Sequence, residues 1–140
     1  MPRALSFLLA CVLLLAADPW TAKDTVQPEE VARDLKTPLV IHVGFSVLYR
    51  GAHITGSQYA GPGSKPEGID MLRKAVAGQP LGREIVLYCG CCPWDKCPNI
   101  RPAFAALHEL GFTHVRVMVI PENLKADWTD KGFPTEKRAE

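Results

Sequence analysis

Short apolar runs, separated by turns and by helix-like patterns, recur along the chain. Three of them are typical of buried strands in a parallel sheet, because nearly every position in them is apolar. They are Leu39–Val43, Ile85–Tyr88 and Val115–Ile120. A shorter strand is expected at Gln58–Tyr59, inside the glycine- and proline-rich stretch 51–68, which otherwise predicts turns.

Helical patterns alternate with these strands. Gln27-Pro28-Glu29-Glu30 predicts a helix start, since proline suits the first helical position and acidic side chains suit the first turn. Further along, Ile69, Leu72 and Val76 recur at helical spacing, and Gly78 is expected to end that helix. A last short helix places Leu124 and Trp128 one turn apart (residues 124 and 128).

The clearest helix follows residue 99. Asn99 is expected to cap its N-terminus and Gly111 to lie just past its C-terminus. Its predicted apolar face consists of Ile100, Ala103, Phe104, Leu107 and Leu110. Strands and helices therefore alternate with connections too long for hairpins, which predicts an α/β fold around a mainly parallel sheet. Ligands of such sheets bind beyond the carboxyl ends of the strands.

The N-terminal segment is typical of a signal peptide. Arg3 supplies a positive charge, and Leu5–Ala17 is apolar, long enough for a signal sequence and too short to span a bilayer. We expect a signal peptide over residues 1–22 and one domain over 23–140. Export would take the protein to the periplasm if it is bacterial, and otherwise to the exterior.

The cleavage position stays open from sequence. Ala16, Ala17 and Ala22 are the candidate small residues. Two alternatives to cleavage and release are lipidation at Cys11, in Leu8-Leu9-Ala10-Cys11, and a retained anchor.

Charge excludes several classes of partner. The 140 residues carry a net charge of +1 with no basic run, so neither nucleic acid nor, after signal removal, a membrane surface is an expected partner. The sequence does not indicate an oligomeric state.

Four of the five cysteines lie in one short segment directly after the strand that ends at Tyr88. They are Cys89, Cys91, Cys92 and Cys97. Thiols this close in sequence can close only a small loop, so they are poor candidates for holding distant segments together. A thiol between a strand end and a helix start meets free backbone N–H groups and a positive helix end, which favour the thiolate. We therefore expect a reactive sulfur site.

The order of these features resembles the rhodanese-like domain, the fold of thiosulfate sulfurtransferases and related persulfide carriers. The resemblance runs from about Gln27 to Lys137. It implies a mainly parallel sheet of about five strands flanked by helices on both faces. Its marks are the strand Leu39–Val43, Ala52-His53-Ile54-Thr55-Gly56-Ser57 (similar to the family's Gly-His-Ile-Pro-Gly-Ala), Tyr88-Cys89, Gly111-Phe112, Asp127-Trp128 and Gly132-Phe133-Pro134.

The resemblance implies that Cys89 is the nucleophile of a sulfurtransferase, with Cys92 and Cys97 as alternatives. It would take a sulfane sulfur from a small-molecule donor such as thiosulfate and pass it to a thiol or cyanide through a persulfide. No metal or organic cofactor is expected. Two departures stand out: His42-Val43-Gly44 replaces the family's usual Asp-Val-Arg, and the cysteine loop is several residues longer than usual.

Neighbouring residues would bind the donor and resolve the product. Lys96 and Arg101 are candidate cations for an anionic donor, Gly90 belongs to the loop whose N–H groups would surround the outer sulfur, and Trp94 walls the pocket or fastens the loop to the core. Cys91, Cys92 and Cys97 are candidate resolving thiols, which can attack a persulfide and form a disulfide.

Other functions would use the same sulfurs. A thiol/disulfide oxidoreductase could use Cys89-Gly90-Cys91-Cys92 as its Cys-x-x-Cys motif, and a metal binder could use up to four thiolates, although zinc ligands usually come as two separated pairs. A phosphatase would need an arginine six positions after its cysteine, and none stands there. A binding module with an inactive site is the remaining alternative. Of the four histidines (His42, His53, His108 and His114), only His42 lies where it could face the site.

Overall fold

The computed structural model describes residues 17–138, so residues 1–16 of the predicted signal peptide lie outside the described residues. The α-helices are α1 (Pro28–Arg33), α2 (Ser46–Gly51), α3 (Pro66–Ala75) and α4 (Ile100–Glu109). The strands are β1 (Thr25–Val26), β2 (Leu39–His42), β3 (His53–Ile54), β4 (Gln58–Tyr59), β5 (Ile85–Tyr88), β6 (Val115–Met118) and β7 (Thr135–Glu136). Short 3-10 turns at Ala22–Asp24 and Trp94–Lys96 and a π-helical turn at Lys125–Thr129 complete the elements.

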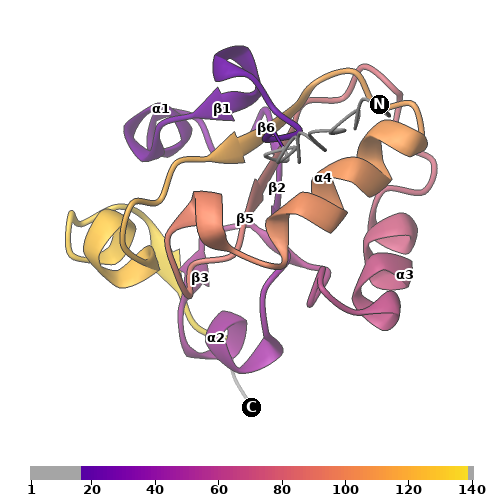
Figure 1. Cartoon of the computed structure of the whole chain (residues 1–140). Helices are drawn as coiled ribbons and strands as arrows, with labels where there is room; N and C mark the ends of the chain where they lie inside the picture. The colour runs from indigo at the N-terminus through magenta and orange to yellow at the C-terminus, as the bar shows by residue number, and fades with distance from the viewer. Residues whose placement is uncertain (1–16, 139–140) are drawn as a thin grey trace, which may run out of the picture.

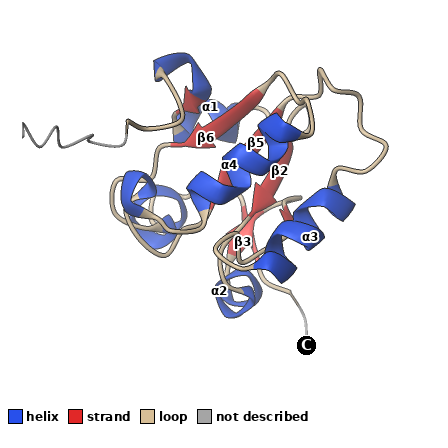
Figure 2. Ribbon diagram, turned by 45° about the vertical axis from the view of Figure 1, so that its right-hand side comes forward, coloured by secondary structure: helices blue, strands red, loops and turns tan. Residues whose placement is uncertain are grey.

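A five-stranded sheet forms the centre of the molecule (Figure 2). Its strand order is β1-β6-β5-β2-β4, and every neighbouring pair is parallel. The sheet confirms the predicted α/β architecture. β5 lies in the middle, between β2 and β6, so the loop that follows it opens at the centre of the carboxyl edge.

Helices cover both faces of this sheet, as predicted (Figure 1). On one face α3 and α4 pack against alternate residues of the central strands, such as Ile41 and Leu87. On the other face α1 and the turn Lys125–Thr129 cover residues such as Val40 and Val86. β5 is buried on both sides because both layers need its side chains, which explains its unbroken apolar pattern.

The predicted helices form with small differences at their ends. α4 buries Phe104 and Leu107 as expected, and Gly111 takes the positive φ of +92° that a helix C-terminus often needs. Leu110 was expected on the apolar face but is 40% exposed. The helix ends at Glu109, so Leu110 already turns away from the core.

Four short elements carry no clear sequence signal: β1, α2, β3 and β7. In α2 only Tyr49 is buried, while Val47 is 64% exposed and Leu48 39% exposed, so no apolar periodicity marks the helix. The two residues of β3 pair antiparallel with β7 in a separate small sheet.

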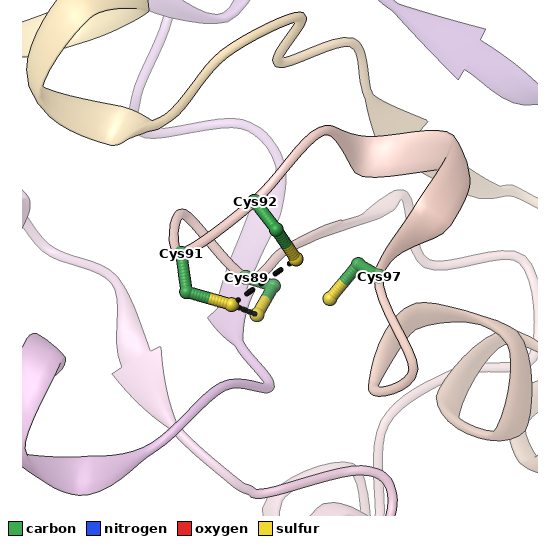
Figure 3. A group of neighbouring side chains, drawn as sticks. All are labelled: Cys89, Cys91, Cys92 and Cys97. Carbon is green, nitrogen blue, oxygen red and sulfur yellow. Dashed lines mark hydrogen bonds between the residues drawn. The ribbon is translucent and has the colours of Figure 1, made fainter.

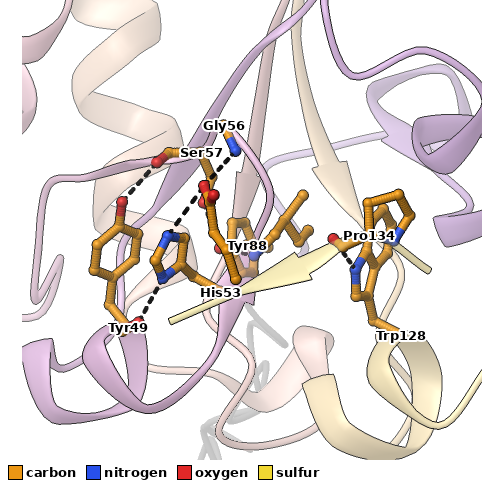
Figure 4. A network of polar contacts seen from close by, with 9 residues as sticks. Tyr49, His53, Gly56, Ser57, Tyr88, Trp128 and Pro134 are labelled. Carbon is orange, nitrogen blue, oxygen red and sulfur yellow. Dashed lines mark hydrogen bonds and ion pairs between the residues drawn. The ribbon is translucent and has the colours of Figure 1, made fainter. Parts of the chain in front are cut away.

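The segment 52–57, one of the marks of the family resemblance, forms a buried polar network (Figure 4). His53 is 4% exposed, stacks on the ring of Tyr49 at 3.8 Å, and its Nδ1 lies 2.7 Å from the Tyr49 carbonyl oxygen. Tyr49 donates its hydroxyl to the carbonyl oxygen of Ser57 at 2.6 Å. Ser57 and Tyr88 share a hydroxyl contact at 2.8 Å, and Tyr88 accepts the Ile54 N–H at 3.1 Å. His53 is therefore structural, as the sequence indicated.

The C-terminal motifs that carry the family resemblance, Asp127-Trp128 and Gly132-Phe133-Pro134, lie near this polar network (Figure 4). Trp128 is fully buried and donates its indole N–H to the Pro134 carbonyl oxygen at 3.0 Å (Figure 4). Glu136 on β7 accepts the Gly56 N–H at 2.8 Å and lies 3.4 Å from His53 Nε2. These contacts fasten the C-terminal segment beside α2 and hold one wall of the carboxyl edge in place.

The packed part of the chain begins before residue 23. Trp20 is only 7% exposed, with its ring 5.5 Å from that of Trp94 and 5.7 Å from that of Phe104. Arg101 lies over the same indole at 5.0 Å and pairs with Asp18. Among residues 17–138, no helix is both long and apolar enough to cross a bilayer.

Candidate active site

The loop after β5 turns back on itself at once. Gly90 has a φ of +82°, which favours glycine. A Cβ at this position would also lie 2.9 Å from the Cβ of Leu124, so both the backbone conformation and the available space require glycine. The Gly90 carbonyl accepts the Leu124 N–H, and the Trp94 N–H reaches the Ile120 carbonyl, both at 3.0 Å. The loop is therefore fixed to the segment after β6.

This path gathers the four loop cysteines into one cluster (Figure 3). All four sulfurs lie within 4.8 Å of one another. Cys91 Sγ lies 3.2 Å from the sulfur of Cys89 and 3.2 Å from that of Cys92. Cys89 and Cys97 are buried, at 3% and 1% exposure, whereas Cys91 is exposed and Cys92 half-buried. The sequence predicted the cysteines as candidates; the structure brings all of them together as free thiols.

The cysteine that ionises most readily in this cluster is Cys97, whereas the sequence analysis favoured Cys89. A hydrogen bond from the Cys89 thiol, together with the backbone N–H groups of Asn99 and Ile100, lowers the pKa of Cys97 to about 6. The same hydrogen bond and burial raise the pKa of Cys89. The expectation of an ionised Cys89 in the resting loop is thus corrected, because it is Cys97 that meets the free N–H groups at the start of α4.

The pKa of Cys92 is raised to about 12, chiefly by burial and by its hydrogen bond with Cys91. Cys92 is therefore a neutral thiol in the resting loop. Its sulfur still stands beside the others and remains available as a second nucleophile once a neighbour is oxidised.

Asn99 has a different role from the predicted helix cap. It stands at the N-cap position of α4, but its side chain makes no capping hydrogen bond. Its amide donates to Cys89 Sγ at 3.4 Å, and its carbonyl oxygen accepts the Ser64 N–H at 3.0 Å. The residue is fully buried, so it holds the Cys89 sulfur in place. Sequence reasoning missed this function, because a polar residue before a helix ordinarily indicates a cap.

Gly44 explains one departure from the family pattern. A Cβ at this position would lie 2.9 Å from Cys89 Sγ and 2.8 Å from His42 Cε1. The site of this chain therefore has no room for any side chain where the family usually has arginine.

A cavity of about 670 Å³ opens at the carboxyl edge beside the cysteines. Cys89, Gly90 and Cys91 line one side of it, and Val47 and Leu48 of α2 form an apolar wall. Lys125 and Lys137 supply the positive charge. Lys125 holds Asp130 at 2.8 Å, whereas no ion pair within residues 17–138 involves Lys137.

The predicted donor-binding residues divide into two groups. Gly90 lines the cavity, but Lys96, Arg101 and Trp94 do not. Arg101 donates to the Asp95 carbonyl oxygen and pairs with Asp18, and Lys96 is exposed on the short turn before Cys97. Trp94 packs between the two apolar clusters, so it fastens the loop to the core. The lysines that do line the cavity come from segments far away in sequence, which no local pattern signals.

His42 lines the cavity as the sequence allowed, but in a neutral form. Burial lowers its pKa to about 4, and its Nδ1 accepts the Gly44 N–H at 3.1 Å. The proton of the neutral ring is therefore on Nε2, which has no hydrogen-bond partner among residues 17–138. His108 and His114 lie instead at a second hollow of about 690 Å³, away from the cysteines.

Comparisons with known proteins agree with this architecture. No protein-family model matches the sequence, and no curated protein gives a significant match. Solved structures do match. The rhodanese-like domain of an Anabaena sp. protein is similar with a TM-score of 0.59 and 21% identity, over 82% of this chain and 80% of that one.

Two further structures extend the comparison. A thiosulfate sulfurtransferase from Pseudomonas aeruginosa matches with a TM-score of 0.61 and 23% identity, over 82% of this chain and 19% of that larger chain. A rhodanese-related protein from Thermoplasma volcanium matches with a TM-score of 0.54 and 16% identity, over 81% of this chain and 98% of that one. At these identities the likeness concerns the fold: the chain has a rhodanese-like α/β fold, with a cysteine-rich loop directly after its central strand.

Proposed function

We propose that this protein is a sulfurtransferase that carries a sulfane sulfur as a persulfide on Cys89. One observation carries the proposal: the Cys89 sulfur lies at the carboxyl end of the central strand, lines an open cavity, accepts a hydrogen bond from the Asn99 side chain, and lies within 4.8 Å of the sulfur of Cys97. The rhodanese-like fold and its likeness to a thiosulfate sulfurtransferase support the same reaction class.

Cys97 serves as the base in this proposal. As the donor enters, the Cys89 thiol gives its proton to the Cys97 thiolate, along the hydrogen bond between them. The Cys89 thiolate then attacks the outer sulfur of thiosulfate, and sulfite leaves with the electron pair of the S–S bond. Cys89 keeps one extra sulfur as a persulfide anion, so charge and electrons balance. Cys97 can accept this proton because it is already ionised in the resting loop, and the side-chain N–H of Asn99, which donates to the Cys89 sulfur, stabilises the thiolate that forms there.

The cavity suits a small anionic donor. Lys125 and Lys137 attract the donor, and the side-chain N–H of Asn99 stabilises negative charge on the Cys89 sulfur. In the second half of the reaction a thiolate or cyanide attacks the outer sulfur and regenerates Cys89. No step in this cycle uses a metal or an organic cofactor.

A thiocyanate assay tests the proposal. The reduced protein, supplied with thiosulfate and cyanide, is expected to form thiocyanate catalytically. Cys89→Ser should abolish turnover, and Cys97→Ser should lower kcat/KM by about 100-fold or more, since general-base catalysis typically contributes 10²- to 10⁴-fold. The assay uses the full-length chain with its N-terminal segment retained, so that Cys11→Ser can serve as a matched substitution outside the loop, and this variant should leave the rate unchanged. An unchanged rate in Cys89→Ser would refute the assignment of the nucleophile.

Thiol/disulfide exchange is the second candidate, favoured by the 3.2 Å between Cys89 and Cys91. In that case the Cys91 thiolate attacks the inner sulfur of a Cys89 persulfide, forms a disulfide and releases hydrosulfide; an external dithiol then restores both thiols. Cys92 and Cys97 stand close enough to act likewise. Sulfide release that needs a dithiol, and is lost in Cys91→Ser, would favour this function over simple transfer.

We also propose export through the N-terminal signal sequence, which rests on the apolar pattern of residues 5–17. The packing of Trp20 supports cleavage at Ala16 or Ala17, since cleavage after Ala22 would remove a core side chain. N-terminal sequencing of the protein recovered from its natural host tests this, and a mature start at Lys23 would contradict it.

A further inference from the structure

The four loop sulfurs are arranged like the ligands of a closed metal site, which sulfur transfer does not require. They lie within 4.8 Å of one another, and the two shortest separations are 3.2 Å. In a tetrahedral zinc site with Zn–S bonds of about 2.3 Å, the ligand sulfurs lie about 3.8 Å apart. The observed separations bracket this value, so small side-chain rotations bring the four sulfurs to ligand distance.

The ligands come from both buried and more exposed parts of the chain. Cys89 ends β5, and Cys97 precedes α4, so two buried sulfurs are held by the fold. Cys91 and Cys92 lie at the outer part of the loop, where Cys91 is exposed and Cys92 half-buried. Sequence spacing argued against zinc because no second, separated pair exists. In the folded chain two of the ligands are instead held by different elements, Cys89 by the end of β5 and Cys97 by the start of α4.

We propose that the reduced loop binds one thiophilic divalent cation of the Zn²⁺ type through Cys89, Cys91, Cys92 and Cys97. As the four metal–sulfur bonds form, the remaining thiol protons leave to the solvent and no electron is transferred. This proposal revises the sequence expectation of no metal. It does not rest on the proposed sulfur transfer, because it requires only four thiolates.

The surroundings of the cluster suit such a centre. Four thiolates and one divalent cation carry a net charge of −2, which needs nearby donors. Asn99 donates its side-chain N–H to Cys89 Sγ at 3.4 Å, and the N–H groups of Asn99 and Ile100 face Cys97. The positive end of the ten-residue helix α4 points at the same sulfur.

A metal bound at this cluster and a persulfide on Cys89 would exclude each other. Four protein ligands complete the coordination of a tetrahedral cation, so no position remains for water or substrate, as in structural rather than catalytic zinc sites. Cys89 cannot hold a metal and a persulfide at once. Bound Zn²⁺ therefore protects the loop thiols and blocks sulfur chemistry, and Cys91, the exposed ligand, is where a cation enters.

Zinc binding can be measured without any sulfur donor. The reduced full-length chain, with its N-terminal segment and Cys11 retained, is incubated anaerobically with ZnCl₂, and the bound metal is measured by native mass spectrometry and by competition with a chromophoric chelator. One Zn²⁺ per chain is expected, and it should protect the four loop thiols, but not Cys11, from alkylation. A wild-type protein that binds no zinc, or whose loop thiols stay as reactive with zinc as without it, overturns the proposal.

Variants assign the ligands. Each of the four Cys→Ser substitutions in the loop should weaken Zn²⁺ binding by more than about 100-fold, the upper range for losing a residue that merely supports a ligand. Cys11→Ser is the matched control and should bind as the wild type does. If the variants at the buried cysteines fail to fold, Cys91→Ser still tests the site, because Cys91 is exposed and its substitution should not disturb the core. An unchanged Zn²⁺ affinity in Cys91→Ser would overturn the four-sulfur site. Zinc binding with no sulfur transfer, or the reverse, separates the two proposals.

Discussion

At the scale of single residues, the proposed mechanism divides its roles between two buried sulfurs, those of Cys89 and Cys97. Cys97 is the better anion because it meets the free N–H groups of Asn99 and Ile100 at the start of α4, while Cys89 meets the cavity. The ionised residue and the residue positioned for the donor are therefore different. In the proposed mechanism a proton passed from Cys89 to Cys97 joins the two roles, so both cysteines are needed.

The low pKa of Cys97 predicts a titration step that can be measured. Cys97 should lose its proton as the pH rises through about 6, well below the ordinary thiol value of 9.0, because Cys89 and the N–H groups stabilise its thiolate. The thiolate absorbance of the reduced protein, followed between about pH 4 and 9, should show this step. The step should vanish in Cys97→Ser and move to higher pH in Cys89→Ser, which removes the thiol donor. A step that persists in Cys97→Ser would refute the assignment.

At the scale of elements, the site depends on how closely the loops after β2 and β5 approach each other. Gly44 follows β2 and its backbone lies against the Cys89 sulfur, while Gly90 turns the β5 loop toward Leu124. Both contacts exclude a side chain. The lengthened loop is therefore a folded part of the site, with its turns fixed by backbone hydrogen bonds to the segment after β6.

Gly44→Ala tests this approach. Its Cβ would displace Cys89 Sγ or His42, so we expect kcat/KM for sulfur transfer to fall at least about tenfold and stability to fall by about 1–3 kcal/mol. Gly82→Ala is the matched control, since nothing lies within 4 Å of an added Cβ there and Gly82 does not line the cavity. It should keep full activity and gain up to about 1 kcal/mol. Thiocyanate kinetics and urea unfolding check both variants, and equal activity in the two would contradict the close approach.

Local patterns in the sequence predict the framework well and the site only in part. Ile85–Tyr88 is apolar throughout because both faces of the sheet need it, so a strand follows from the pattern alone. The contacts of Asn99 join residues 10 and 35 positions away, and a local pattern carries no signal of them. For the same reason the lysines of the cavity were missed, and Arg101 was expected at the site although it pairs with Asp18.

At the scale of the whole molecule, the N-terminal segment belongs to the packing that supports the loop. Trp20 lies against Trp94, which fastens the cysteine loop, and against Phe104 of α4. The first residues of the domain and its active loop are therefore mechanically joined, although they are more than seventy positions apart (residues 20 and 94).

Trp20→Ala should destabilise the domain by about 3 kcal/mol, because a large buried side chain is lost from between two aromatic rings. The midpoint of urea unfolding measures the change. Phe45→Ala, in which the lost aromatic ring is 43% exposed, is the control and should change stability by less than about 0.5 kcal/mol. Equal midpoints for the two variants would show that Trp20 does not pack as described.

The central claim, a sulfur carried on Cys89, is tested most directly by intact mass. The reduced full-length chain, with its N-terminal segment retained, is mixed with thiosulfate and separated from it, and its mass is measured before and after treatment with cyanide. We predict that the wild-type chain gains the mass of one sulfur atom, that cyanide removes it, and that Cys89→Ser gains none while Cys11→Ser gains one. A wild-type chain whose mass does not change, or a Cys89→Ser chain that still gains a sulfur, would contradict the account.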